Sequence, residues 1–328
     1  LFELIPFQSA PYVNPKFKNT INNLLRLNKF DHVICYMSRT FPAINQKELQ
    51  GNKKLPISVY AIDPLALSYK KISSKTKNII SLAYLIEGWL IKRLDQNIID
   101  GNHGFALISE SDKKEYINFL GISKKDSIYT VPYGVDGERE ELFFDKRIAG
   151  RVIVTGSGNY KPNQDALKYV LQKVWPLFDD NPALHLVIAG SGYSKEILRL
   201  AKPFKSVKFL GFVDDIKYEL RRSSYALCLV DLEFGVQTKV LEAMSSGTPT
   251  ICSSASNKGI AGIDGLHLLI ADKPDEVLAC FNRFEEDPNL SQLISQNSRK
   301  FIYLNFSWNK SAEKLINFIT KKEPEGNC

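Results

Sequence analysis

One stretch of sequence decides the fold: Phe234-Gly235-Val236-Gln237-Thr238-Lys239-Val240-Leu241-Glu242-Ala243-Met244-Ser245-Ser246-Gly247-Thr248-Pro249. An apolar run, Tyr225 to Val230, precedes it, and Thr250 to Cys252 is apolar again. Inside the stretch, apolar side chains recur at the spacing of one helical face. The pattern predicts a strand, a tight turn, a helix, a second turn and a second strand.

The start of this helix suits an anion. Gly235 lets the backbone approach a ligand closely, and the first N–H groups of a helix favour negative charge. Lys239 adds a full positive charge one turn in, and Glu242 follows three residues later on an adjacent part of the surface. A phosphate beside a lysine, with a carboxylate for hydroxyl groups, fits a sugar nucleotide. The alternative is an ordinary crossover helix with a surface Lys/Glu pair.

Composition predicts a two-domain globular chain. Its 328 residues are 44% hydrophobic and 24% charged, enough for two cores of ordinary size. The net charge of +7 is modest, so nucleic acid is not expected as a partner. The five cysteines are dispersed, which favours a reducing, cytoplasmic compartment. The longest apolar run, Ile79 to Ile91, is too short to span a bilayer.

The first half alternates short apolar runs with helical patterns, which is typical of β/α units on a parallel sheet. The chain opens without an initiator Met, and a missing first strand and helix is one alternative for this domain. The expected strands are 1–5, 32–36, 57–62, 105–108 and 127–131, and the expected helices are 15–27, 76–100 and 111–120.

Polar residues follow two of these strands, at Ser38-Arg39-Thr40 and Asp63-Pro64. Ligands gather beyond the carboxyl ends of parallel strands, so Arg39 and Asp63 are candidates for an acceptor site. Ordinary loop polarity is the alternative. Further on, the basic segment Lys70 to Lys77 leads into an apolar, aromatic helix. A helix on an anionic membrane surface has this composition, and so has a core helix with a charged start.

The second half repeats the β/α pattern beyond a highly charged segment, Gly137 to Arg147, where the domain boundary is expected. We assign residues 1–136 to the first domain, 137–305 to the second, and 306–328 to a helix and tail that return toward the first. The expected strands are 151–155, 184–189, 207–210, 225–230, 250–252 and 267–270. The expected helices are 163–178, 194–201, 215–223, 235–246 and about three pieces from 274 to 321.

Five motifs in this half resemble, in order, those of the group-one glycosyltransferases, which are retaining enzymes with two Rossmann-like domains (GT-B). The motifs are Val131-Pro132-Tyr133-Gly134-Val135-Asp136, Thr155-Gly156-Ser157-Gly158-Asn159-Tyr160-Lys161-Pro162-Asn163, Ile188-Ala189-Gly190-Ser191-Gly192, Phe209-Leu210-Gly211-Phe212-Val213-Asp214-Asp215, and the opening stretch. Five motifs in family order are far more specific than one. Phe306-Ser307-Trp308 extends the resemblance weakly toward the end.

The resemblance implies an α/β fold in which the two domains face each other across a cleft. The second domain would bind a nucleoside-diphosphate sugar, with UDP favoured, and the first a glycan or lipid-linked acceptor of bacterial surface polysaccharide synthesis. Glu242 matches the residue that holds the ribose hydroxyls. The resemblance implies further donor contacts from three loops: Gly156, Ser157, Gly158, Asn159 and Lys161 at the phosphates; Gly190, Phe212 and Val213 at the base; and Gly235, Val236, Gln237 and Thr238 at the sugar and diphosphate.

The chain departs from the family pattern in three places. The first carboxylate of the E-x7-E motif falls on Phe234, and Glu233 lies one residue too early, so either Glu233 substitutes or this branch lacks the group. The basic residues usual in the first loop are replaced by Ser157 and Pro162. The family's His-Asp pair reads Ile62-Asp63.

These departures make Lys239 the expected stabiliser of the leaving diphosphate, with help from Lys161, and Glu233 and Asp63 the other catalytic candidates. No Asp-x-Asp pair occurs, so neither a metal nor another cofactor is required; the nucleotide sugar is a co-substrate. Peripheral attachment to the inner membrane face is expected if the acceptor is lipid-linked. The alternatives are a catalytically silent sugar-nucleotide-binding subunit and a related enzyme such as an epimerase.

Overall fold

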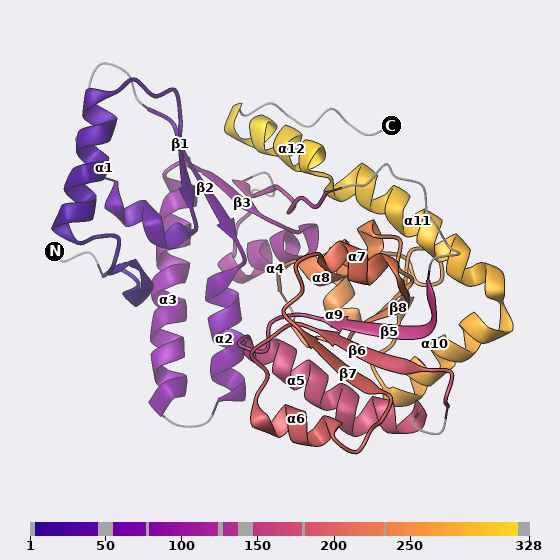
Figure 1. The fold of residues 1–328 in the computed structure, drawn as a ribbon. Helices are drawn as coiled ribbons and strands as arrows, with labels where there is room; N and C mark the ends of the chain where they lie inside the picture. Colours follow the sequence, from indigo (N-terminus) through magenta and orange to yellow (C-terminus); the bar gives the residue numbers. More distant parts are fainter. Residues whose placement is uncertain are drawn as a thin grey trace. The chain divides into compact units, whose positions relative to one another are not determined.

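The computed structural model describes residues 4–44, 55–76, 79–123, 127–136, 147–178, 181–232 and 234–320. The chain divides into two compact units: unit 1 is Leu1–Pro132 with Ala312–Cys328, and unit 2 is Tyr133–Ser311. Each unit is built on a parallel sheet with helices, as the α/β prediction required (Figure 1). The boundaries assigned from the sequence, after residues 136 and 305, stay a prediction.

Unit 1 contains a parallel sheet of order β1-β2-β3-β4. Its central strand β3 is buried at all four residues, as a strand covered on both faces must be. Residues 1–3 of the expected first strand lie outside the described residues, and Leu4 and Ile5 are not in a strand. The strands are β1(Val33–Tyr36), β2(Ile57–Ile62), β3(Gly104–Leu107) and β4(Tyr129–Thr130); the helices are η1(Phe7–Ser9), α1(Pro15–Leu27), η2(Ser38–Ala43), α2(Leu65–Lys75), α3(Ile79–Asp100) and α4(Glu110–Leu120).

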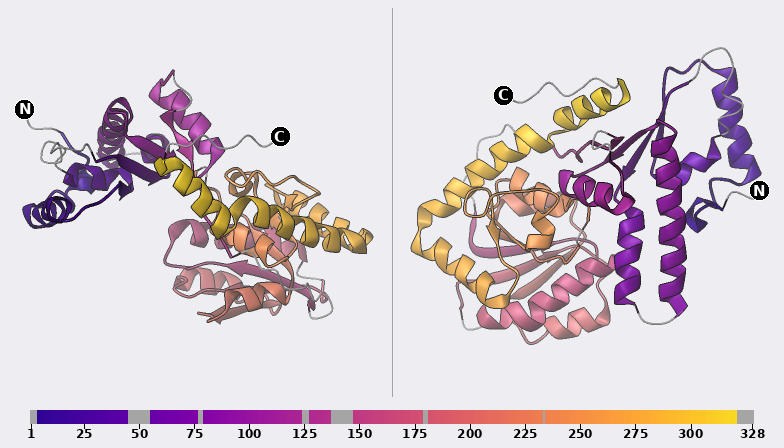
Figure 2. Two further views of the ribbon diagram at one scale, coloured as in Figure 1. Left: turned by 90° about the horizontal axis from the view of Figure 1, so that it is seen from above. Right: turned by 180° about the vertical axis from the view of Figure 1, so that it is seen from behind.

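The helix expected over residues 76–100 begins later, and a separate helix precedes it. Thr76 is extended, so α2 ends at Lys75 and α3 begins at Ile79. The two helices lie side by side (Figures 1 and 2). A β-carbon at Gly88 would lie 3.1 Å from Cβ of Tyr69, so the glycine permits this close packing.

Unit 2 contains a parallel sheet of order β10-β9-β8-β5-β6-β7. Along β5 the side chains alternate: Val152 and Val154 enter a large core with Trp175, and Ile153 enters a smaller core with Ala243. Both faces are therefore covered by helices. The strands are β5(Ile148–Thr155), β6(His185–Ala189), β7(Val207–Gly211), β8(Ser223–Cys228), β9(Thr250–Cys252) and β10(Leu269–Ile270).

The helices of unit 2 follow the expected order with three differences: the helix expected over 235–246 begins at Thr238, a short helix at Ser254–Asn257 was not expected, and one helix is irregular. The single helix expected over 163–178 is α5, then a π-helical turn, then a 3-10 turn at Pro176, where a regular helix cannot continue. The helices are α5(Lys161–Tyr169), η5(Val170–Val174), η6(Trp175–Phe178), α6(Lys195–Ala201), α7(Ile216–Arg221), α8(Thr238–Ser245), α9(Ser254–Asn257), α10(Pro274–Glu286) and α11(Pro288–Phe306).

The last helix is α12(Trp308–Thr320), and its residues from Ala312 onward belong to unit 1. Phe318 is buried with Ala106 of β3 and Val131, and its ring contacts Tyr129 of β4 at 5.2 Å between centroids. Unit 1 is therefore completed by chain that follows unit 2 in sequence.

Candidate functional site

The sheet of unit 2 has a topological switch point between β5 and β8. From β5 the chain moves to β6 on one side, and β8 lies on the other side. The carboxyl ends of two strands that diverge in this way leave a crevice where ligands bind in open α/β sheets. The loop at Gly156 follows β5, and the stretch that leads to α8 follows β8.

The glycine loops after β5 and β6 are in close contact. The N–H of Gly156 donates to Ala189 O at 3.0 Å, and the N–H of Gly158 donates to Ser191 O at 2.8 Å. Gly190 has φ +145°, and a β-carbon there would lie 1.9 Å from the carbonyl oxygen of Gly156. Only glycine fits such an approach, so the two loops form a fixed backbone surface.

Lys239 lies against the first of these loops. Its Nζ donates to Asn163 Oδ1 at 2.5 Å, and Asn163 Nδ2 donates to Ser157 O at 2.9 Å. A β-carbon at Gly156 would lie 3.0 Å from Lys239 Nζ. The structure thus brings together the cation of α8 and the loop after β5, which the sequence nominated separately for the phosphates.

Burial shifts the pKa values of Lys239 and of the ionisable groups around it. Burial lowers the pKa of Lys239, and the neighbouring Cys228 and Glu242 partly offset this. Burial raises the pKa of Glu242, while Lys217 and Lys239 lower it. The thiol of Cys228, at the end of β8, has its pKa raised by burial to about 11 and stays neutral. A cation and a carboxylate therefore share a partly desolvated site, where each interacts strongly with a ligand.

The start of α8 is open to an anion. Gln237 is the N-cap residue but makes no capping hydrogen bond with its side chain, and the first turn contains no acid. Gly235 has φ +81°, and the carbonyl of Gly235 would meet a β-carbon at Gly259 at 2.2 Å. The close approach of Gly259 thus fixes the turn that leads into α8, and the N-terminal end of this helix carries partial positive charge.

At the first carboxylate of the E-x7-E motif, the structure describes Phe234 but not Glu233. Phe234 lies under Lys258, with the lysine Nζ 5.4 Å from the ring centroid. Glu233 lies outside the described residues. Its catalytic role remains a prediction.

The remaining donor candidates differ in exposure. Lys161 forms an exposed ion pair with Asp165 on its own helix. Phe212 is 77% exposed just after β7, and Val213 is packed against the smaller core. The backbone N–H of Asn159 donates to Ser157 Oγ at 3.2 Å within the loop after β5.

In unit 1, Asp63 occupies a strained position after β2. Ile62 has φ +73°, which is unusual for a β-branched residue and is tolerated mainly at functional positions. One carboxylate oxygen of Asp63 is buried without a hydrogen bond among the described residues. Burial and the nearby Asp112 raise the pKa of Asp63 from 3.8 to about 6. Asp63 is therefore a carboxyl group ready to accept a hydrogen bond from a ligand hydroxyl.

Arg39, the other acceptor candidate, has different partners. It lies in η2, donates from Nη1 to Gln8 Oε1 at 2.8 Å, and contacts the sulfur of Met37. These contacts hold η2 against η1. The described contacts of Arg39 and Asp63 do not bring the two side chains together.

A hollow of about 520 Å³ opens beside α5, at the ends of β8, β9 and β10. It shares no residue with the predicted donor site, and Asp165, Asp231 and Asp272 line it. Three carboxylates disfavour a diphosphate, so the surroundings of Lys239 are the better anion site. Within the described ranges, no cluster of three or more His, Cys, Asp or Glu residues could hold a metal ion. None of the helices described combines the length and hydropathy that crossing a membrane requires.

Sequence reasoning missed three residues of this site. Asn163 links Lys239 to the loop after β5, Tyr193 donates its hydroxyl to Gly156 O at 2.9 Å, and Lys217 contacts Asp136 Oδ2 at 2.9 Å. Asn163 lies in a glycine-rich motif and Tyr193 directly follows another, so both could have been nominated from the sequence. Lys217 lies in no such motif.

Comparisons with known proteins agree with this geometry. Residues 150–287 match the family model described as Glycosyl transferases group 1. An uncharacterized glycosyltransferase of Methanocaldococcus jannaschii, MJ1607, is 27% identical over 164 residues, which are 47% of this chain and 41% of that protein. A second from the same organism, MJ1069, is 24% identical over 346 aligned positions, covering 96% of this chain and 83% of that protein.

Solved structures share the fold at low identity. Sucrose-phosphate synthase from Thermosynechococcus elongatus superposes with a TM-score of 0.70 at 14% identity, over 96% of this chain and 79% of that one. Alr3699/HepE from Anabaena, in complex with UDP and glucose, gives 0.68 at 12% identity, over 93% and 81%. TarM gives 0.66 at 14% identity, and this chain covers only 57% of it. These likenesses confirm the predicted fold of two Rossmann-like domains.

Proposed function

Because the chain belongs to the group-one glycosyltransferases, we propose that it transfers a hexose or N-acetylhexosamine from a nucleoside-diphosphate sugar, with retention of configuration. The observation that carries the proposal is the cluster of Lys239, Asn163 and Gly156 at the switch point. A half-buried cation beside a rigid backbone loop and an uncapped helix start is what a leaving diphosphate needs.

In the proposed reaction, the bond between the sugar C1 and the β-phosphate oxygen breaks while the acceptor oxygen bonds to C1 from the same face. The proton of the acceptor hydroxyl passes to an oxygen of the leaving phosphate. Lys239 and the N–H groups at the start of α8 stabilise the charge that develops on the diphosphate. Glu242 accepts hydrogen bonds from the ribose hydroxyls, and Phe212 and Val213 contact the base.

Asp63 is assigned to the acceptor. Its buried, unsatisfied oxygen and its pKa near 6 support a hydrogen bond to an acceptor or sugar hydroxyl. We assign the acceptor to a glycan or lipid-linked glycan of bacterial surface polysaccharide synthesis, met at the inner face of the membrane. The donor is assigned as a UDP-sugar. Similar folds include Alr3699/HepE bound to UDP and glucose, which supports this choice.

The test is a transfer assay with UDP-, GDP- and ADP-sugars, preceded by thermal unfolding with each free nucleotide. A nucleotide whose free concentration is 100 times its dissociation constant raises the free energy of unfolding by about 2.7 kcal/mol. We expect UDP to raise the melting temperature and transfer to depend on Lys239 and Glu242. Stabilisation by none of the three nucleotides contradicts the proposal.

The second candidate is a silent sugar-nucleotide-binding subunit. Phe234, which replaces a carboxylate and packs under Lys258, favours it. Nucleotide binding without transfer or donor hydrolysis, whatever the acceptor, is the result expected for that candidate.

A further inference from the structure

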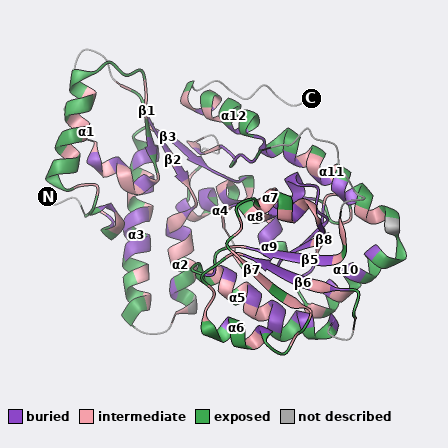
Figure 3. Cartoon of the chain, viewed as in Figure 1, coloured by how far each residue is buried: buried purple, intermediate pink, exposed green. Residues whose placement is uncertain are grey.

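An unusual surface lies on α3 of unit 1. Six large apolar side chains on this helix are exposed, four of them by more than half: Ile79 at 83%, Ile80 at 55%, Leu82 at 56%, Leu85, Ile86 and Trp89 at 52%. Five of them share one helical face, and we call these the α3 stripe: Ile79, Leu82, Leu85, Ile86 and Trp89. They lie opposite the face that carries the buried Glu87, Ile91 and Asp95. The N-terminal part of α3 is coloured largely as exposed in Figure 3. An exposed apolar patch of this kind marks an interaction site.

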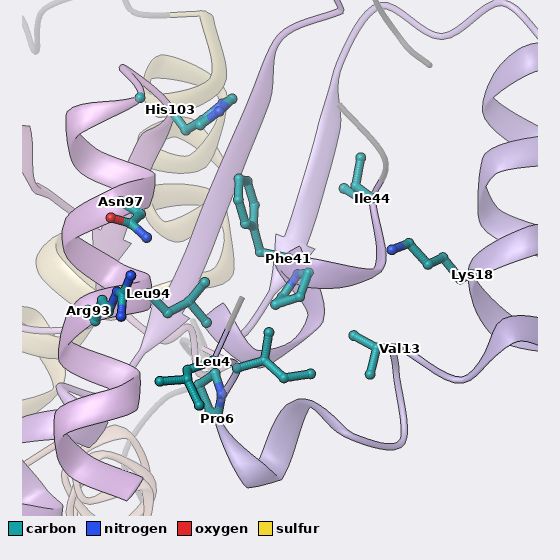
Figure 4. Close-up of a pocket in the computed structure, with 13 residues that line it drawn as sticks. Leu4, Pro6, Val13, Lys18, Phe41, Ile44, Arg93, Leu94, Asn97 and His103 are labelled. Carbon is teal, nitrogen blue, oxygen red and sulfur yellow. The ribbon is translucent and has the colours of Figure 1, made fainter. Parts of the chain in front are cut away.

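The α3 stripe ends at a pocket. Arg93 lies one turn beyond Trp89, with its guanidinium carbon 5.8 Å from the centroid of the indole, and it lines a pocket of about 730 Å³. Figure 4 shows Lys18 reaching into this pocket from α1, with Arg93 across from it on α3. Apolar side chains, including Phe41 and Leu94, form the walls between the two cations. The volume suits a small-molecule headgroup with part of an apolar chain.

The charge of this surface is positive. From Leu65 to Leu94 the single acid is Glu87, and its carboxylate is buried and accepts the N–H groups of Phe7 and Gln8 at 2.7 and 3.0 Å. The described residues place no carboxylate in ion-pair contact with Lys18 or Arg93. Both cations are therefore available to an anion.

Two of the lysines that the sequence nominated for a membrane, Lys70 and Lys71, have partners of their own. Lys70 lies 5.3 Å above the ring of Phe119, and Lys71 pairs with Glu115 at 3.7 Å. Lys77 lies outside the described residues. The free cationic surface is therefore the end of the α3 stripe rather than the start of the basic segment.

We propose that the α3 stripe and the pocket beside it bind the phosphate-bearing lipids of an anionic membrane. The apolar side chains of the stripe enter the interface, and Lys18 and Arg93, on opposite sides of the pocket, each attract a lipid phosphate. The positive charge of Lys18 and Arg93 complements the phosphates of anionic lipids, and the apolar stripe complements their acyl chains. The inference rests on the proposed function in one respect: a lipid-linked acceptor gives the enzyme a reason to bind there.

The experiment is sedimentation of the full chain with vesicles of phosphatidylcholine, with and without phosphatidylglycerol. Two cations near an anionic surface contribute about 1 kcal/mol each, so we expect the phosphatidylglycerol vesicles to bind about 30-fold more tightly. The double variant Lys18→Gln/Arg93→Gln should lose this preference. The variant Leu82→Ser/Trp89→Ser should bind at least about tenfold more weakly to both vesicles, because two apolar side chains no longer enter the interface.

The matched control is Leu304→Ser/Lys300→Gln on α11, which removes one exposed leucine, 51% accessible, and one exposed lysine of unit 2. It should bind vesicles like the parent. Tryptophan fluorescence gives a second readout. Trp89→Phe should abolish the blue shift on vesicle binding, while Trp308→Phe should retain it.

Three results would overturn the inference. One is vesicle binding that survives the stripe variant. Another is a parent that binds inorganic phosphate through Lys18 and Arg93 but no vesicle, which makes a free phosphate the ligand. The third is a parent dimer that the stripe variant turns into a monomer, which makes the surface an interface between copies. UDP stabilisation and transfer to a water-soluble acceptor are measured without vesicles, so failure here leaves the proposed function standing.

Discussion

The carboxyl ends of the two sheets carry opposite chemistry. In unit 2 the strands β5 and β8 end in glycine loops and lead to Lys239, so the site presents N–H groups and positive charge. In unit 1 the strand β2 ends just before Asp63, whose pKa is raised by burial and, to a lesser extent, by the nearby Asp112. The two sheets share one β/α architecture but suit different ligands. The carboxyl end of the unit 2 sheet suits an anion, and that of the unit 1 sheet suits hydroxyl groups. The residues at the strand ends decide this, not the fold.

The largest effect on this contrast between the two sheets is expected from removing Lys239, the cation of unit 2. Lys239→Ala should lower kcat about 10²- to 10³-fold, the usual effect of losing one group that stabilises transition-state charge. Lys208→Ala, an exposed lysine on β7, is the control and should leave kcat unchanged. If Lys239→Ala retains full kcat, the diphosphate is stabilised elsewhere.

The rigidity of the unit 2 loops can be tested with a matched glycine pair. Gly190→Ala places a methyl group 1.9 Å from Gly156 O and should lower the free energy of unfolding by about 3 to 4 kcal/mol. At Gly211, with φ +73° and no atom within 4 Å of an added β-carbon, alanine should cost about 1 kcal/mol. Chemical denaturation measures both. Equal losses would mean that the close contact between the loops is not a constraint.

The carboxyl group of unit 1 predicts a pH dependence of stability. Because the folded pKa of Asp63, about 6, lies above the ordinary 3.8, folded protein binds the proton more tightly. The free energy of unfolding should therefore fall as the pH rises from about 4 through about 6, by at most about 3 kcal/mol. Asp63→Asn should remove this decline and be the more stable protein at pH ~7. Parallel pH profiles of parent and variant would count against a buried, raised carboxyl group.

The smallest effect concerns Asn163, which positions Lys239 and does not itself touch the reacting atoms. Asn163→Ala should lower kcat about tenfold, since losing one hydrogen bond to a charged group is worth about 1.5 kcal/mol. Because burial already lowers the pKa of Lys239, losing the amide acceptor should lower it further. The alkaline limb of the kcat profile should then move to lower pH, and Asn163→Asp should restore it. A change in stability alone, with no movement of the pH profile, would assign Asn163 a purely structural role.

Local signals predicted most elements of the fold. The bounds of α1 follow from Asn14, which caps Phe17 N–H, and from Pro15 at the first helical position. Strand β10 is shorter than expected because His267 Nδ1 accepts the N–H of Ile263 in a turn instead. Helix α2 was missed as a separate element because the basic segment Lys70 to Lys77 contains no Gly or Pro that would mark a helix end.

The site was predictable only in pieces. Glycines, Lys239 and Glu242 carried motif signals, but the bond between Asn163 and Lys239 joins residues 76 positions apart. Such a contact depends on how α5 and α8 are held by the sheet, which no local pattern encodes. Lys217 is likewise brought to Asp136 by the fold alone.

The return of α12 to unit 1 has a consequence for biosynthesis. Phe318 covers Ala106, and a β-carbon at Gly104 would lie 3.0 Å from its ring. Residues Tyr133–Ser311 are translated in between, which takes roughly 10 to 40 s at ~5–20 residues per second. During that interval the ribosome has released the strands of unit 1 without the helix that covers them. The sheet of unit 1 therefore stays exposed to chaperones until residues 312–320 have been translated.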